Sequence, residues 1–202
     1  MNLKEYHINS LEEDTVYWNV LCQTSSQSVI PREKTKVLAV ACGKLTEGKV
    51  LSEFFNTEEV YGIDIDVSST NCAKQNNSHI DEENIQVGDA KSIQARFRQK
   101  FDVITLRHPH LTENPENWKK ILESCLKALK SDGILIVSTF TLTELQIILR
   151  MCLLESVKIP IATNNKYLSP LNPLFDAYIC VIRKGDLVLD LLSRLQASFE
   201  TK

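Results

Sequence analysis

The stretch that decides the fold is Lys36-Val-Leu-Ala-Val-Ala-Cys-Gly-Lys-Leu-Thr-Glu-Gly48, which is followed by Val60-Tyr-Gly-Ile-Asp64. Its continuous apolar run from Val37 to Ala41 is typical of a parallel strand that is covered on both faces. A turn containing Gly43 follows, then a helix, and then a second strand that ends in an acid. This order is the one in which a doubly wound α/β domain binds an adenosine-containing cofactor.

The rest of the chain alternates between segments with strand and helix patterns. Further strands are expected near residues 59–65, 84–87, 101–106, 134–139, 157–162 and 175–183, and helices near 47–55, 68–76, 115–130 and 141–155. This alternation predicts a mainly parallel sheet with helices on both faces. Ligands of such sheets bind beyond the carboxyl ends of the strands, where the strand order reverses. The candidate turns are therefore those after Ala41, Ile63, Val87 and Leu106.

Local signals mark where several helices begin and end. Asn114 before Pro115 predicts a helix start, and Thr141 with Glu144 three positions later forms a capping box. Ser131-Asp-Gly133 is expected to end the helix that begins at Pro115. The chain is thus expected to have three parts. These are an N-terminal helical cap over residues 1–33, an α/β domain over 34–185, and a C-terminal helix over 186–202 that packs on the domain or at a dimer face.

Composition and charge exclude several kinds of protein. The chain has 202 residues, 43% of them apolar and 24% charged, which suits one soluble domain. The net charge of −3 argues against a large nucleic-acid interface, and no apolar run approaches the roughly 20 residues that cross a membrane. The six cysteines form no Cys-x-x-Cys pair, so neither a zinc site nor a disulfide framework is expected. Because the N-terminus lacks a hydrophobic signal segment, a cytoplasmic location is expected.

Three positions in the candidate turns have chemistry that suits an adenosine group. Gly43 has no Cβ, so the backbone there can approach a ligand closely. Asp64 follows Gly43 by 21 residues, at the end of the second strand, where a carboxylate can accept hydrogen bonds from the ribose hydroxyls. Asp89 follows the third strand, where an acid can accept a hydrogen bond from an exocyclic amine. Each acid also has a plainer interpretation as a helix or turn cap, and Asp66 competes with Asp64 for the ribose.

Five segments follow one another in a fixed order. They are Val37-Leu-Ala-Val-Ala-Cys-Gly43, Gly62-Ile-Asp64, Gly88-Asp-Ala90, Phe101-Asp-Val-Ile104 and Leu126-Lys-Ala-Leu-Lys-Ser-Asp-Gly-Ile-Leu-Ile136. Together they resemble the motifs of class I S-adenosylmethionine-dependent methyltransferases, over about residues 34 to 185. The resemblance implies a Rossmann-like sheet of seven strands whose last strand is antiparallel, and S-adenosylmethionine as the cofactor. It also implies the residues that hold this cofactor, namely Ala41, Cys42, Gly43, Asp64, Ile65, Asp89 and Ala90.

The chain departs from the pattern of that family at three positions of the first turn. Members usually carry an acid where Ala39 stands and glycines where Ala41 and Leu45 stand. Leu45 is expected to put a branched side chain where the turn normally passes the cofactor. The change Leu45→Gly is therefore expected to improve cofactor binding if the site has decayed, and to damage a site that is shaped around leucine.

The turn after the fourth strand, Leu106-Arg-His-Pro-His-Leu111, faces the reacting methyl group in the family. It lacks the Asn-Pro-Pro-Tyr type of sequence found in amine methyltransferases. Arg107 is a candidate for binding a carboxylate or phosphate of the acceptor, and His108 or His110 for acting as general base. Plainer roles, as exposed side chains or as a histidine bound by backbone, stay open for all three. Two histidines alone do not complete a metal site, so no metal is expected.

Three functions are compatible with these residues. The first is methyl transfer from S-adenosylmethionine to a small-molecule acceptor, which Arg107 and His108 would orient or deprotonate. The second is a non-catalytic binding or scaffold protein that has kept the fold but has an altered cofactor turn. The third, a nicotinamide-dependent dehydrogenase, shares the Gly43-to-Asp64 spacing but lacks the Gly-x-Gly-x-x-Gly pattern because Leu45 takes the middle position. The five ordered motifs favour the first.

Overall fold

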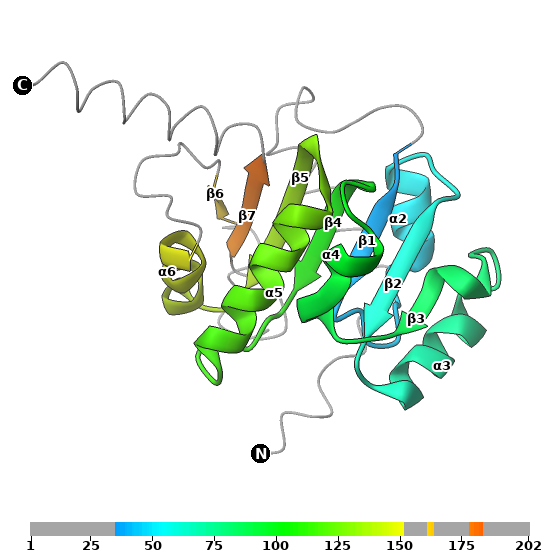
Figure 1. The fold of residues 1–202 in the computed structure, drawn as a ribbon, viewed down its shortest axis with the longest axis horizontal. Helices are drawn as coiled ribbons and strands as arrows, with labels where there is room; N and C mark the ends of the chain where they lie inside the picture. The colour runs from blue at the N-terminus through cyan, green and yellow to red at the C-terminus, as the bar shows by residue number, and fades with distance from the viewer. Residues whose placement is uncertain (1–34, 152–160, 164–177, 184–202) are drawn as a thin grey trace, which may run out of the picture.

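A single mixed sheet forms the centre of the protein (Figure 1). The computed structural model describes residues 35–151, 161–163 and 178–183. The strands are β1 (Val37–Val40), β2 (Val60–Asp64), β3 (Ile85–Val87), β4 (Phe101–Arg107), β5 (Leu129–Thr139), β6 (Ile161–Thr163) and β7 (Tyr178–Arg183). They form a seven-stranded sheet in the order β3-β2-β1-β4-β5-β7-β6. Neighbouring strands from β3 to β5 are parallel, whereas β7 runs antiparallel to both β5 and β6.

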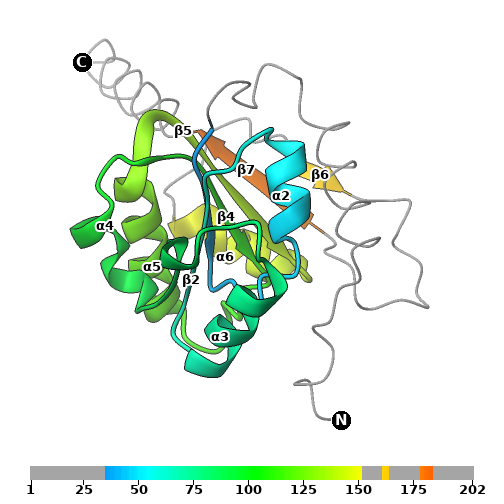
Figure 2. The same cartoon turned by 90° about the vertical axis from the view of Figure 1, so that its right-hand side faces the viewer.

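Helices cover both faces of this sheet. They are α2 (Gly48–Phe54), α3 (Val67–Asn76), α4 (Ile93–Arg96), α5 (Pro115–Ala128) and α6 (Leu142–Met151), with short 3-10 turns η2 (Glu82–Asn84) and η3 (Ala90–Ser92). Helices α4, α5 and α6 pack over one core, which includes Leu38 and Ile104. Helices α2 and α3 pack over a second core on the other face, which includes Val37 and Val103. Figure 2 shows α4 and α5 on one side of the sheet and α2 on the other.

This architecture confirms the predicted doubly wound, mainly parallel α/β fold with an antiparallel last strand. Two predicted helix starts are confirmed as well. Asn114 Oδ1 accepts a hydrogen bond from the backbone N–H of Asn117 at 3.2 Å, just before α5. Thr141 and Glu144 form the reciprocal bonds of a capping box before α6, at 3.2 and 3.1 Å. The predicted N-terminal cap and C-terminal helix lie outside the described residues. Among the helices that are described, none has both the length and the apolar character needed to cross a membrane.

The prediction that Ser131-Asp-Gly133 ends a helix is wrong. Helix α5 already ends at Ala128, and β5 begins at the next residue, so the segment lies inside that strand. The reason is a tertiary one. Leu129 pairs with Phe101 of β4 ahead of a register shift before Val103, and this irregular pairing extends β5 toward the helix. The short helical turns η3 and α4 are further elements that the sequence pattern does not predict.

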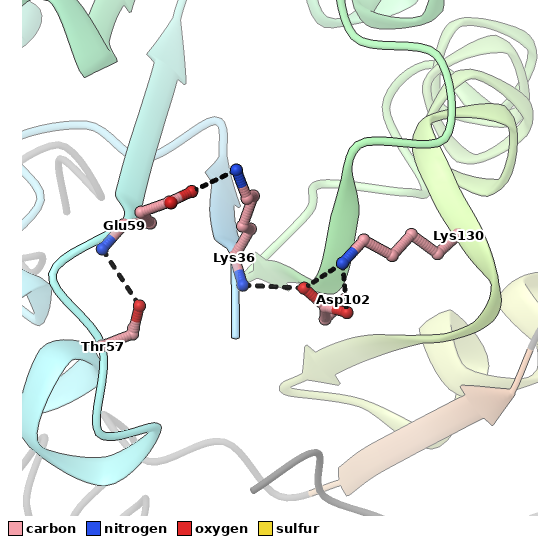
Figure 3. Close-up of polar contacts among 5 residues, drawn as sticks. All are labelled: Lys36, Thr57, Glu59, Asp102 and Lys130. Atoms are coloured by element: carbon pink, nitrogen blue, oxygen red, sulfur yellow. Dashed lines mark hydrogen bonds and ion pairs between the residues drawn. The ribbon is translucent and has the colours of Figure 1, made fainter. Parts of the chain in front are cut away.

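Charged side chains tie together the amino ends of four strands (Figure 3). The Asp102 carboxylate of β4 accepts a hydrogen bond from the backbone N–H of Lys36, at 2.8 Å, and pairs with the Lys130 ammonium of β5, at 2.7 Å. The Lys36 ammonium, just before β1, contacts Glu59, just before β2, at 2.6 Å. The strands are therefore aligned by charge at the end of the sheet that lies opposite the candidate turns.

Asn77 holds the turn between β1 and α2 against helix α3. Its buried side-chain amide donates hydrogen bonds to the carbonyl oxygens of Leu45 and Ala73, each at 2.9 Å. Gly48, the first residue of α2, leaves the space that this amide occupies. A Cβ at Gly48 would overlap Asn77 Oδ1 and would come within 3.1 Å of Ile80 Cδ1. Glycine is thus required here by close packing.

The change Gly48→Ala is expected to lower the free energy of unfolding by about 1–3 kcal/mol, the usual cost of overpacking. The added methyl group must displace the Asn77 amide and weaken its bond to Leu45. Urea denaturation of the purified protein measures the loss. Because Asn77→Ala removes the atom that clashes, the double variant should be less destabilised than the sum of the single variants. Strict additivity would contradict this account of Gly48.

Candidate functional site

The register of the sheet brings the ends of five strands to one level. Val40 of β1 pairs with Ile63 of β2 on one side and with Leu106 of β4 on the other. The next residue of each of these three strands lies one step nearer the carboxyl ends. With their partners on β3 and β5, these residues make a row across the sheet. From one side to the other, the row is Val87, Asp64, Ala41, Arg107 and Ser138. It crosses the point where the strand order reverses, which is where ligands bind in this kind of sheet.

The turn after β1 keeps a left-handed backbone although it is poor in glycine. Ala41, Gly43 and Leu45 have φ angles of 51°, 51° and 48°. L-residues other than glycine rarely adopt this conformation, because their Cβ crowds the backbone. The turn is closed by hydrogen bonds from the N–H of Cys42 to the carbonyl of Ile63 at 3.1 Å, and from the N–H of Leu45 to the carbonyl of Cys42 at 2.8 Å.

The Leu45 side chain is fully buried in the core beneath α2, so the expectation that it lies on the cofactor's path is wrong. The absence of a side chain at Gly62 of β2 makes room for it. A Cβ there would lie 3.2 Å from Leu45 Cδ2 and 3.1 Å from Cys42 Sγ. Leu45 therefore combines a left-handed backbone with a side chain that packs in the core.

Asp64 connects the end of β2 to the turn after β1. Its Oδ2 accepts a hydrogen bond from the N–H of Gly43 and its Oδ1 accepts one from the N–H of Asp66, both at 2.8 Å. Asp66 has a different role, because its carboxylate caps α3 by accepting a hydrogen bond from the N–H of Ser69 at 2.6 Å. That bond holds the pKa of Asp66 below its usual range. Of the two acids, Asp64 is the one that is joined to the glycine turn.

Large apolar side chains are exposed beside Asp64. Ile65 and Val67, which follow β2, are 74% and 56% exposed, and Val87 at the end of β3 is 47% exposed. Exposed apolar side chains that gather at strand ends mark a surface for a ligand with apolar faces. Ile65 is one of the predicted residues, whereas Val67 and Val87 are additions from the structure. The signal for them in the sequence is a valine at a strand end or within three residues beyond it.

Asp89 caps the short turn η3, which begins at Ala90. Its carboxylate accepts a hydrogen bond from the N–H of Lys91 at 2.9 Å and pairs with the Lys91 ammonium at 3.1 Å. The bond from the Lys91 backbone is the main reason why the pKa of Asp89 lies below its usual range. Gly88 donates its N–H to the carbonyl of Asp64 at 2.8 Å, which places Asp89 next to the end of β2. The adenine contact predicted for Asp89 and Ala90 stays a prediction.

Arg107 forms an ion pair with Glu47 across the first turn. The guanidinium Nη1 lies 3.8 Å from Glu47 Oε2, and each side chain is only 10% exposed. Glu47 directly precedes α2, so the pair joins the turn after β1 to the end of β4. Glu47 is a functional candidate that the motif comparison misses, because the motif ends at the glycine positions before it. An acid at the start of the helix after this turn is the signal that could have found it.

His108 is fixed against Phe140 at the carboxyl ends of β4 and β5. The two rings stack with their centroids 4.3 Å apart and their planes 18° apart. The N–H of His108 donates to the carbonyl of Ser138 at 3.2 Å, and its φ of 52° is left-handed. Non-glycine residues held in this conformation concentrate at functional sites. His110 differs, because it is exposed and its carbonyl accepts a hydrogen bond from Trp118 Nε1 at 3.0 Å.

Cys42 carries a thiol whose pKa is raised well above its usual range. Burial of the side chain is the largest cause, and the negative charges of Asp64 and Glu47 add to it. The thiol is therefore protonated and poorly nucleophilic at neutral pH. Nor do the described residues contain a group of three or more His, Cys, Asp or Glu side chains that could hold a metal ion.

Cys42 is expected to react with iodoacetamide at pH 8 at least about tenfold more slowly than Cys72 of α3, although both side chains are half-buried, because only the thiolate attacks and the pKa of Cys42 is raised. The rate of Cys42 should rise steeply between pH 8 and pH 9. Both values lie well below its raised pKa, so its small thiolate fraction keeps growing with pH and does not level off. Timed alkylation followed by peptide mass spectrometry measures both rates. In guanidinium the two rates should become equal, and equal rates in the folded protein would contradict the assignment.

Comparison with known proteins agrees with this geometry. The family model described as a methyltransferase domain matches residues 31–171, more than half of the chain, so the protein belongs to the methyltransferase domain family. The resemblance and the enzyme class predicted from the sequence are thereby confirmed, and the family supports S-adenosylmethionine as the cofactor. No protein of curated function matches the chain significantly.

Many solved structures share the fold. An rRNA methylase from Streptococcus thermophilus is 11% identical, with a TM-score of 0.58 over 88% of this chain and 98% of that one. The PH0226 protein from Pyrococcus horikoshii OT3 is 23% identical, with a TM-score of 0.51 over 76% of this chain and 68% of that one. Geranyl diphosphate C-methyltransferase from Streptomyces coelicolor A3(2), in complex with S-adenosyl-L-homocysteine, is 9% identical, with a TM-score of 0.50 over 63% and 46%. Two further solved structures are about twice as long as the part that they share with this chain, which covers 50% of one and 53% of the other. At these identities the likeness shows the fold alone.

Proposed function

We propose that this domain binds S-adenosylmethionine and transfers its methyl group to a small-molecule acceptor. The observation that carries the proposal is the position of Asp64, which is joined to Gly43 at the carboxyl end of β2 and has exposed Ile65 and Val87 beside it. A carboxylate next to apolar side chains suits a nucleoside, because the ribose hydroxyls donate hydrogen bonds and the faces of the base are apolar.

The residues of the chain would contribute mainly by positioning the acceptor. When bound, the cofactor supplies a methyl group on a sulfonium that a nucleophile can displace in line. Holding the acceptor against that group removes much of the entropic cost of the reaction. His108 is the proposed general base. Its ring is fixed against Phe140, and a neutral imidazole nitrogen can accept a proton from an attacking hydroxyl, thiol or amine.

A small acceptor is favoured over RNA by charge. The chain carries a net charge of −3, and carboxylates lie on both sides of the first turn, at Asp64 and Glu47. A phosphate backbone binds where Lys and Arg side chains concentrate. Asp64 and Glu47 do not form such a surface.

Calorimetric titration of the protein with S-adenosylmethionine and S-adenosylhomocysteine tests the proposal. We expect one ligand to bind per chain, and the absence of heat at millimolar ligand would remove the main support. The acceptor class needs a second experiment. The protein is incubated with methyl-labelled cofactor and either a mixture of small amines, thiols and phenols or total RNA. Label in the small-molecule fraction is expected, whereas label in the RNA alone would contradict the proposed acceptor.

A non-catalytic binding protein is the second candidate. It is favoured by Ala39, which is buried on β1 and gives the site no carboxylate at a position where the family usually has one. This candidate predicts that the cofactor binds but that no small molecule is methylated. The titration and the labelling experiment together therefore separate the two functions.

A further inference from the structure

We propose that Glu47 and Arg107 together bind the charged amino-acid group of the cofactor, with Glu47 receiving its ammonium and Arg107 its carboxylate. This inference rests on the proposed function, because it concerns the same ligand. It assigns a role to a residue that the motifs do not include, and it gives Arg107 a role toward the cofactor in place of the acceptor.

Glu47 and Arg107 bury two opposite charges at one place. Both side chains are 10% exposed, and the closest charged atoms are 3.8 Å apart, compared with 2.7 Å for Asp102 and Lys130. Taking two charges out of water is costly, and charged groups that a fold nevertheless buries concentrate at functional sites.

The pair lies at the same end of the sheet as Asp64. Arg107 stands in the same row of the sheet as Asp64, with β1 between them, which corresponds to about 10 Å at the usual strand spacing. Glu47 belongs to the turn that includes Gly43 and Cys42. The charges of both Glu47 and Asp64 act on the Cys42 thiol, so both carboxylates lie near this turn. A ligand that places its ribose at Asp64 would extend its other end toward Glu47 and Arg107.

The charges of the pair complement those of the ligand group. The amino-acid group of S-adenosylmethionine is a zwitterion, and its two charges match an acid and a guanidinium held side by side. Binding would convert one ion pair into an alternating set of four charges with no change in net charge. It would also provide a carboxylate for the ammonium in a turn whose strand offers only Ala39. Between residues 41 and 48, Glu47 is the one acidic residue.

The test compares two ligands that differ only in this group. S-adenosylhomocysteine carries the amino-acid group, whereas 5′-methylthioadenosine has the same nucleoside and thioether sulfur without it. The double variant Glu47→Gln/Arg107→Met removes both charges at once, so that no buried charge is left alone. We expect it to bind S-adenosylhomocysteine about 10- to 100-fold more weakly, as for lost hydrogen bonds to charged groups, and 5′-methylthioadenosine as the unmodified protein does.

Lys130→Met is the matched control, because it breaks an ion pair at the opposite end of the strands and should leave both affinities unchanged (Figure 3). Circular dichroism and thermal melts check that the variants are folded, and Glu47→Gln alone provides a second variant with one charge kept. An equal loss of affinity for both ligands would overturn the inference, since it would indicate a structural role. A gain in affinity for S-adenosylhomocysteine would also overturn it, because the pair would then obstruct the ligand. If the unmodified protein binds neither ligand, the proposed function fails, and the inference fails with it.

Discussion

Leu45→Ala is expected to lower the free energy of unfolding by about 3 kcal/mol, as is usual when a buried leucine is truncated. The side chain is fully buried in the core beneath α2, where it packs above Gly62. Alanine removes this packing and still has a Cβ at a φ of 48°, so it recovers none of the backbone strain. Urea or thermal denaturation measures the loss.

Two glycine variants separate packing from backbone strain at this turn. Leu45→Gly loses the same packing but relieves about 1–2 kcal/mol of left-handed strain. It should therefore be at least about as stable as Leu45→Ala. Ala41→Gly is the matched control, because Ala41 has a φ of 51° and an exposed side chain. It should raise stability by up to about 1 kcal/mol, since strain is relieved with no loss of core. If Ala41→Gly destabilises the protein, the left-handed turn is not as described.

The Leu45 variants also bear on cofactor binding. Of the two outcomes foreseen for Leu45→Gly, the buried side chain favours damage to a site shaped around leucine. A loosened core beneath the turn would leave Gly43 less well placed for the ligand. Improved binding by this variant would instead mean that leucine obstructs the site, against the position in which the structure has its side chain.

Asp64→Ala is expected to weaken binding of S-adenosylhomocysteine by about 10- to 100-fold, which corresponds to about 1.5–3 kcal/mol for hydrogen bonds to a charged group. The substitution removes the acceptor proposed for the ribose hydroxyls. It also removes the bond at 2.8 Å that holds the N–H of Gly43. Asp64→Asn, which keeps one acceptor oxygen, should show a smaller loss. Calorimetry or ligand-induced thermal stabilisation measures both affinities.

Asp66→Ala is the control for this experiment. Asp66 lies two residues further on and caps α3 through Ser69, so its loss should lower stability modestly. Its effect on ligand affinity should be small, because its carboxylate serves the helix. Equal losses of affinity in the two variants would mean that the end of β2 matters only as a scaffold, and the ribose contact would then have to be abandoned.

The sequence predicts the sheet and the row of candidate residues well, and for a clear physical reason. Hydrophobic patterns fix which segments are strands, and parallel strands bring their carboxyl ends to one edge. Asp64 and Arg107 therefore fall into one row once the strands are recognised, although their roles toward a ligand stay predictions.

The structural features that the sequence does not predict depend on contacts between distant residues. The direction of the Leu45 side chain is set by a left-handed φ and by the space above Gly62, and neither is visible in a motif. The pairing of Glu47 with Arg107 joins positions 60 residues apart in the chain. The early start of β5 follows from the pairing of Leu129 with Phe101, which overrides a segment that looks like a helix stop.

The charged network at the amino ends of the strands has a consequence for how this chain can diverge. Lys36, Glu59, Asp102 and Lys130 connect β1, β2, β4 and β5 at the end of the sheet opposite the candidate turns. The turns at the other end are then not alone in aligning the strands, so a substitution in them need not shift the register of the sheet. Proteins with such a network can replace glycine with alanine or leucine in the turn after β1, and so change the ligand site, while the register of the sheet stays the same.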